Sequence, residues 1–95
     1  MSRTTHVFRL FVAGREHNSA LARTNLAQLC EKHLKGRHRI DIVDVLKNTA
    51  IALEFRVLVT PTLMLVRPRP EVTVLGNLND TREVLAALRL IGGER

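Results

Sequence analysis

Val7-Phe8-Arg9-Leu10-Phe11-Val12-Ala13-Gly14 carries the strongest strand signal of this chain, and the other elements are best placed relative to it. The residues before Gly14 are apolar apart from Arg9, which is typical of a strand buried on both faces. We expect a helix directly afterwards, capped at Asn18 or Ser19 and ended at Gly36, because apolar residues recur there at helical spacing. The recurring residues are Leu21, Ala22, Leu26, Leu29 and Cys30.

A second strand is expected over residues 39–45. In a strand, Ile40 and Ile42 lie on one face and Val43 and Val45 on the other. A strand, a helix and a strand in succession form a βαβ unit, whose parallel strands are joined by a right-handed crossover. The first half of the chain therefore predicts an α/β fold.

A short helix and a strand limited by proline follow this unit. We expect Asn48 to cap a helix over residues 49–56, with Ile51 and Phe55 one turn apart on the same face. The next apolar run is interrupted by Pro61. Proline has no N–H for a ladder, so the strand is expected to begin after it, over residues 62–66.

Two turns, a strand and a final helix complete the chain. The turn with Pro68 and Pro70 leads to a strand at residues 72–75, and residues 76–79 turn again. The last helix is expected to be capped by Asp80 and to end at Gly92-Gly93. Its apolar stripe consists of Val84, Leu85, Leu88 and Ile91. The resulting order, βαβαββα, is the thioredoxin-like arrangement, in a single α/β domain of residues 1–95 with its core at residues 6–92.

The composition argues against several classes of function. The chain has 95 residues, a formal net charge of +6, one cysteine, three phenylalanines and no tryptophan or tyrosine. The scarcity of aromatic side chains argues against single-stranded nucleic-acid binding, which relies on stacking. A lone cysteine, the lack of a long apolar run and a short polar start at residues 1–6 favour the cytoplasm and argue against export or membrane insertion.

The positive charge is concentrated locally at residues 32–39 and 67–69. Such clusters form either a solvated basic surface or the docking site of an acidic protein partner. We expect no nucleic-acid partner, because this interpretation would rest on charge alone.

Enzymatic and metal sites are not expected. A redox-active thioredoxin-like protein has Cys-x-x-Cys at the start of the first helix, but residues 15–18 read Arg-Glu-His-Asn. Cys30 falls on the apolar stripe, which predicts a buried thiol, and a redox or stress role through Cys30 is the alternative. Cys30 and His33 have no second ligand pair at a recognised spacing, and no phosphate-binding glycine string occurs, so no metal or cofactor is expected.

Five strings resemble one known family. These are Leu10-Phe11-Val12-Ala13-Gly14, Asn18-Ser19, Asp44-Val45-Leu46-Lys47-Asn48, Thr60-Pro61-Thr62-Leu63, and Gly76 followed by Leu78. In this combination, without gaps from about residue 7 to residue 91, the chain resembles the KaiB family of circadian clock proteins. The resemblance implies a non-enzymatic regulator that docks on KaiC, a ring-shaped RecA-like ATPase and autokinase, and helps to capture KaiA. A module that binds a SasA-type histidine kinase is the alternative implied by the shared fold.

The resemblance also implies site residues and a second fold. The partner-binding surface is expected around Lys47, Asn48, Leu53 and Arg56. Family members exchange the thioredoxin-like form for a βαββααβ form, so Pro61, Gly76 and Asn77 are expected to matter for the switch. The Thr60–Pro61 bond is expected to be cis, by resemblance to thioredoxins.

The chain departs from the clock proteins at several positions that bear on binding. Leu21 replaces an arginine of the first helix, Val72 and Thr73 replace a basic pair, and Thr49 replaces a proline, whereas a basic residue is kept as Arg56. These differences indicate a KaiB-like paralogue or a homologue outside the full three-protein clock. A homodimer or homotetramer is expected, because a core of this size is marginal and self-association would stabilise it.

Overall fold

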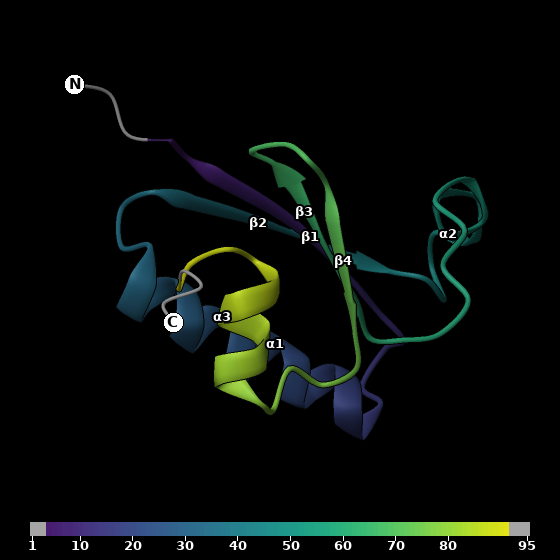
Figure 1. Ribbon diagram of the computed structural model, residues 1–95. Coiled ribbons are helices and arrows are strands. Elements are labelled where there is room, and N and C mark those ends of the chain that lie inside the picture. The colour runs from purple at the N-terminus through teal and green to yellow at the C-terminus, as the bar shows by residue number, and fades with distance from the viewer. Residues whose placement is uncertain (1–3, 92–95) are drawn as a thin grey trace.

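The central strand is β1 (His6–Val12), as the computed structural model shows for residues 4–91, the part of the chain that it describes. It pairs in parallel with β2 (His38–Asp44) and antiparallel with β3 (Thr62–Arg67). β4 (Val72–Leu75) pairs antiparallel with β3, which gives the order β2-β1-β3-β4 (Figure 1). The expectation of a buried inner strand at residues 7–13 is confirmed.

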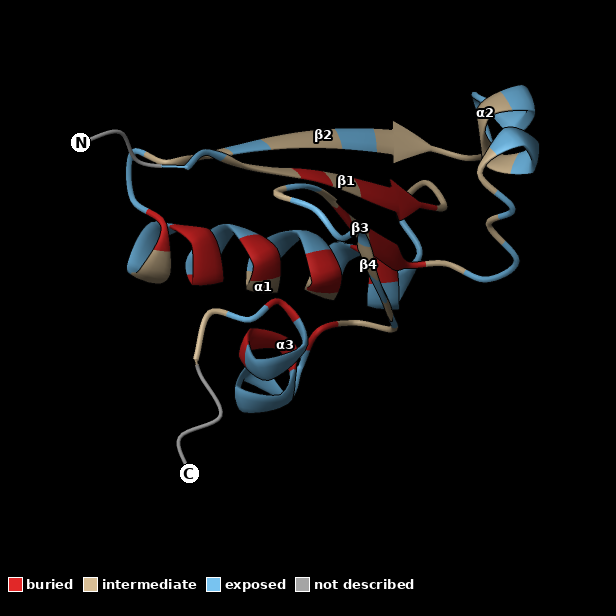
Figure 2. Cartoon of the chain, turned by 45° about the horizontal axis from the view of Figure 1, so that its top comes forward, coloured by how far each residue is buried: buried red, intermediate tan, exposed pale blue. Residues whose placement is uncertain are grey.

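Three helices complete the predicted order. They are α1 (His17–His33), α2 (Thr49–Glu54) and α3 (Thr81–Ala87), so the sequence of elements is βαβαββα, as expected of the thioredoxin-like form. Figure 2 shows α1 and α3 on the same side of the sheet, whereas α2 lies apart, beyond the end of β2. One sheet face therefore carries the core, and most of the other face has no helix over it.

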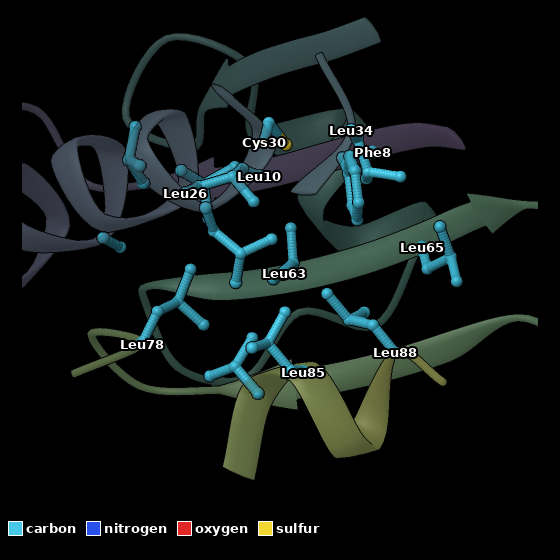
Figure 3. Packing of buried hydrophobic residues seen from close by; sticks show 14 residues of the cluster. Phe8, Leu10, Leu26, Cys30, Leu34, Leu63, Leu65, Leu78, Leu85 and Leu88 are labelled. Carbon is cyan, nitrogen blue, oxygen red and sulfur yellow. The ribbon is translucent and has the colours of Figure 1, made fainter. Parts of the chain in front are cut away.

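The core is aliphatic apart from Phe8 and Cys30. Side chains from α1 and α3 meet alternate residues of β1 and β3, as Figure 3 shows. The residues of the cluster that are less than 2% exposed are Phe8, Leu10, Val12, Ala22, Leu26, Cys30, Leu34, Leu63, Leu65 and Leu88. Burial of one such large side chain contributes about 1.5–3 kcal/mol, so this layer supplies most of the stabilisation.

The first turn of α1 differs from the expectation. Glu16, rather than Asn18 or Ser19, is the N-cap, because its carboxylate accepts the backbone N–H groups of Asn18 (3.1 Å) and Ser19 (3.0 Å). Ser19 is buried one turn inside the helix, where its hydroxyl donates to Glu16 (2.8 Å) and accepts the N–H of Ala13 (3.1 Å). The serine thus ties the helix start to the end of β1.

The end of α3 was also predicted wrongly. Gly92-Gly93 lies outside the described residues, and the helix ends at Ala87, before Ile91 of the predicted stripe. Arg89 takes a left-handed conformation (φ 61°), and the N–H of Leu90 bonds the carbonyl of Leu85 at 2.8 Å. This is the Schellman arrangement, with arginine in the position that glycine usually occupies.

Hydrogen bonds join the loop from Gly76 to Asn79 to the residue before β3 and to α1. The Gly76 N–H donates to the carbonyl of Pro61 (3.0 Å), and the Asn77 side chain donates to Asn18 of α1 (3.1 Å). Asn25 of α1 donates to the backbone carbonyl of Asn77 (2.9 Å). Pro61 follows a cis bond, as expected, and the bonds before Pro68 and Pro70 are cis as well.

Asp44 joins the two loops at the carboxyl ends of β1 and β2. Its Oδ1 accepts the N–H of Gly14 (3.1 Å) and the N–H of Leu46 (3.0 Å). The hydrogen bonds from Leu46 and Gly14, followed by the nearby charges of Lys47 and Arg23, hold the pKa of Asp44 below its ordinary value of 3.8. Asp44, the last residue of β2, therefore anchors the loops that follow both strands.

Substitution of Gly76 by alanine is predicted to destabilise this fold by about 1 kcal/mol or more. Gly76 has φ 100°, which side chains rarely tolerate, while no atom lies within 4 Å of a Cβ at this position, so the cost comes from the backbone alone. Urea unfolding of both proteins measures the difference. Equal free energies of unfolding would contradict this account of the loop.

Substitution of Asp44 by asparagine, its neutral isostere, is predicted to lower stability near neutral pH and to matter progressively less in acid. The pKa of Asp44 is lowered in the folded state, so its contribution is present above the ordinary value and is lost as the pH falls through the lower folded value. Urea unfolding at neutral pH and well below pH 3.8 tests this. Glu54→Gln, at an exposed residue of α2, is the control, and a difference for Asp44→Asn that stays constant with pH would contradict the prediction.

Candidate protein-docking site

Exposed apolar side chains gather around α2. Among residues 4–91, six large apolar side chains are exposed, namely Ile42, Leu46, Leu53, Leu58, Val59 and Leu75. Four of them border α2, and Leu58 and Leu53 are the most exposed of all, at 91% and 74%. Single exposed leucines are common on protein surfaces, but a contiguous apolar patch indicates an interaction site.

A groove runs between α2 and the segment that follows it. Its volume is about 390 Å³, and it is lined by Val45, Thr49, Ala52, Leu53, Val57, Leu58, Val59 and Thr60. We call it the α2 groove. The side chains that line it are apolar except for two threonines, so the groove can receive apolar side chains of a partner.

One aromatic contact fixes α2 to the sheet. None of the α2 residues is buried, but Phe55, directly after the helix, packs against Phe11 of β1 with 5.9 Å between the ring centres. The guanidinium of Arg9 lies 4.6 Å from the centre of the Phe55 ring, which adds a cation–π interaction. The predicted pairing of Ile51 and Phe55 on one face is confirmed, since both line the hollow against Val43 of β2.

The chain reverses after α2 through a second Schellman arrangement. Arg56 is left-handed (φ 59°), and the N–H of Val57 bonds the carbonyl of Ala52 at 2.9 Å. The helix therefore ends at Glu54, two residues before the predicted end. This reversal places Leu58 and Val59 on the same groove as Leu53.

The predicted partner-binding residues lie on this segment. Lys47, Asn48, Leu53 and Arg56 are all exposed, and Leu53 lines the groove. Asn48 occupies the N-cap position, but its side chain makes no capping hydrogen bond; it donates instead to the carbonyl of Asp44 (3.3 Å).

Leu46, Leu58 and Val59 were missed as site residues. Leu58 and Val59 belong to the apolar run at residues 57–66, part of which lies before Pro61 and outside any predicted strand. The signal available in the sequence was an apolar segment that lies outside every predicted helix and strand.

The residues expected to matter for the switch are Pro61, Gly76 and Asn77. Pro61 is buried directly beyond the groove, and its carbonyl accepts the N–H of Gly76, whereas Asn77 lies against α1.

The Cys30 thiol lacks the setting of a redox centre. It is fully buried in the core, and burial, followed by the charge of Glu31, raises its pKa to about 12. The reactive form of cysteine is the thiolate, so this thiol stays protonated and shielded at physiological pH.

Two further properties concern metals and membranes. Within residues 4–91, no three side chains of the His, Cys, Asp or Glu type converge as metal ligands would. In the same part of the chain, the helices are too short or too polar to cross a membrane.

Comparison with known proteins identifies the family. The model of the KaiB domain matches residues 9–90. The chain is 39% identical to the circadian clock oscillator protein KaiB of Synechococcus elongatus, over 97% of this chain and 90% of that protein. It is 40% identical to KaiB of Thermostichus vulcanus, over 94% of this chain and 82% of the relative.

Solved structures agree on the fold. Chloroplastic thioredoxin z superposes with a TM-score of 0.76 at 21% identity, over 93% of this chain and 80% of that one. The N-terminal domain of SasA from Synechococcus elongatus superposes with a TM-score of 0.65 at 18% identity, over 100% of this chain and 93% of that one. The fold is thioredoxin-like, and by its sequence the chain belongs to the KaiB family.

Proposed function

We propose that this chain is a non-enzymatic regulator that docks on a KaiC-type ATPase ring through the α2 groove. The observation that carries the proposal is the cluster of four exposed apolar side chains around α2, with Leu53 and Leu58 projecting into solvent. The clock function of its relatives, which are named circadian clock oscillator proteins, supports a role as a clock-type regulator.

The energetics of the groove suit a protein partner. Complete burial of Leu53 and Leu58 against a partner would contribute about 1.5–3 kcal/mol each. Lys47 and Arg56 lie near the two ends of α2 and favour a partner surface with carboxylates beside its apolar residues. We also propose that the free protein forms a homodimer or homotetramer, because self-association that buries this patch would be stabilising. KaiA and a SasA-type histidine kinase are further partners that we infer from family membership.

The double substitution Leu53→Ser with Leu58→Ser is predicted to weaken binding to a KaiC-type ATPase about tenfold or more, because both apolar contacts are lost. Pull-down or calorimetry with ATP present, after incubation for hours, measures the affinity. Both side chains are exposed, so the unfolding free energy should stay within about 0.5 kcal/mol of the original value. No detectable binding of the unchanged protein at micromolar concentration would refute the proposal.

Leu75→Ser is the matched control, because Leu75 is 63% exposed on β4 and does not line the groove. This variant should bind as the original protein does; equal loss in both variants would mean that the groove is not the docking site.

Arg56→Gly removes the positive charge of Arg56 without straining the backbone, since glycine accepts the left-handed conformation of this residue (φ 59°). It should weaken binding and make the remaining affinity less dependent on salt.

A further inference from the structure

Five arginines belong to segments that come together where β1 begins, at the end of the sheet away from α2 (Figure 1). They are Arg37, Arg39, Arg67, Arg69 and Arg89, which we call the arginine pole. The His6 N–H donates to the carbonyl of Arg37 (2.9 Å), and Val7 is paired with Arg39 on one side and Arg67 on the other. The strand ends and connections that carry these arginines thus lie around the start of one strand.

Two of the guanidinium groups are held in place by the backbone. Arg37 donates to the carbonyl of His33 (3.3 Å), and Arg89 donates to the carbonyl of Pro70 (3.2 Å). Each guanidinium has five N–H groups, so most of the donors of both side chains remain available to a ligand. Planar groups held in this way match the paired oxygens of a carboxylate or a phosphate.

The pole is only weakly neutralised. Arg39 pairs with Asp41 (3.5 Å), but no other arginine of the pole forms an ion pair within residues 4–91. Burial lowers the pKa of His6, and the positive charges of Arg37 and Arg89 lower it further.

Independently of the α2 groove, we propose that the arginine pole binds a short acidic segment of a protein partner, rich in Asp and Glu. Four unpaired arginines match a few carboxylates. A nucleic-acid duplex held by so few phosphate contacts would bind only weakly at physiological salt, since its affinity rises with the number of counterions released. The exposed large apolar side chains of the described residues lie outside the pole, so nothing there would insert into a lipid surface.

A synthetic peptide of consecutive Asp and Glu residues, titrated into the full chain, tests the proposal by NMR. Amide signals of residues 34–39, of Arg67, Arg69 and Glu71, and of residues 88–90 are expected to shift. Saturation is expected on the order of millimolar peptide or below at low salt, with about tenfold weaker binding at 0.15 M salt. A peptide with Asn and Gln in place of Asp and Glu is the ligand control. It should leave these signals in place.

Arg67→Glu with Arg69→Glu should abolish the shifts, because both side chains are exposed and hold no hydrogen bond among the described residues. Arg15→Glu with Arg23→Glu makes the same change in net charge elsewhere and should preserve binding. Equal loss in both double variants would overturn the proposal in favour of general charge attraction. Tighter binding at 0.15 M salt to a short DNA duplex, or to vesicles with anionic lipids, would also overturn it. These outcomes do not depend on a KaiC-type ATPase, so they leave the proposed function untouched.

Discussion

Residues of β1 alternate between the two sheet faces, so Phe11 lies opposite the core residues Leu10 and Val12, on the face that α1 and α3 leave uncovered. Its side chain is nevertheless fully buried. The ring of Phe55 covers it, with Arg9 stacked on Phe55 in turn. None of the α2 residues is buried, so this aromatic contact holds α2 against the sheet, whereas the aliphatic core holds α1 and α3. The position of the α2 groove, and of Leu53 and Leu58 along it, depends on this contact.

The two ends of the sheet differ in chemistry as a result of topology. β1 and β2 are parallel, so both carboxyl ends point toward α2, where Asp44 joins the loops and apolar side chains are exposed. The start of β1 lies at the other end, beside the Arg37 loop and the turn after β3. A seven-residue strand is about 20 Å long, so an apolar groove and a basic surface lie far enough apart to contact different parts of a partner.

The order of elements could be predicted from the sequence because hydrophobic periodicity is local and strong. Each strand was placed within one or two residues, and the breaks at Pro61 and Gly76 were recognised from backbone chemistry alone. The ends of α2 and α3 could not be predicted, since arginine replaces glycine at both left-handed positions. Lys47, Asn48, Leu53 and Arg56, which the resemblance predicts as partner-binding residues, are all exposed. The exposure of Leu58 could not be predicted, because it depends on the reversal of the chain at Arg56.

Hydrogen exchange of a Phe55→Ala variant tests most directly whether one aromatic contact presents the docking surface. We expect the amides of Ala52 and Val57, which are hydrogen-bonded within and just after α2, to exchange about tenfold faster or more, because the aromatic pair and its buried area are lost. The amides of α1 and β3 should keep their protection, and Leu58→Ala should change neither region. Unchanged protection at Ala52 and Val57, or an equal loss throughout the chain, would contradict the account.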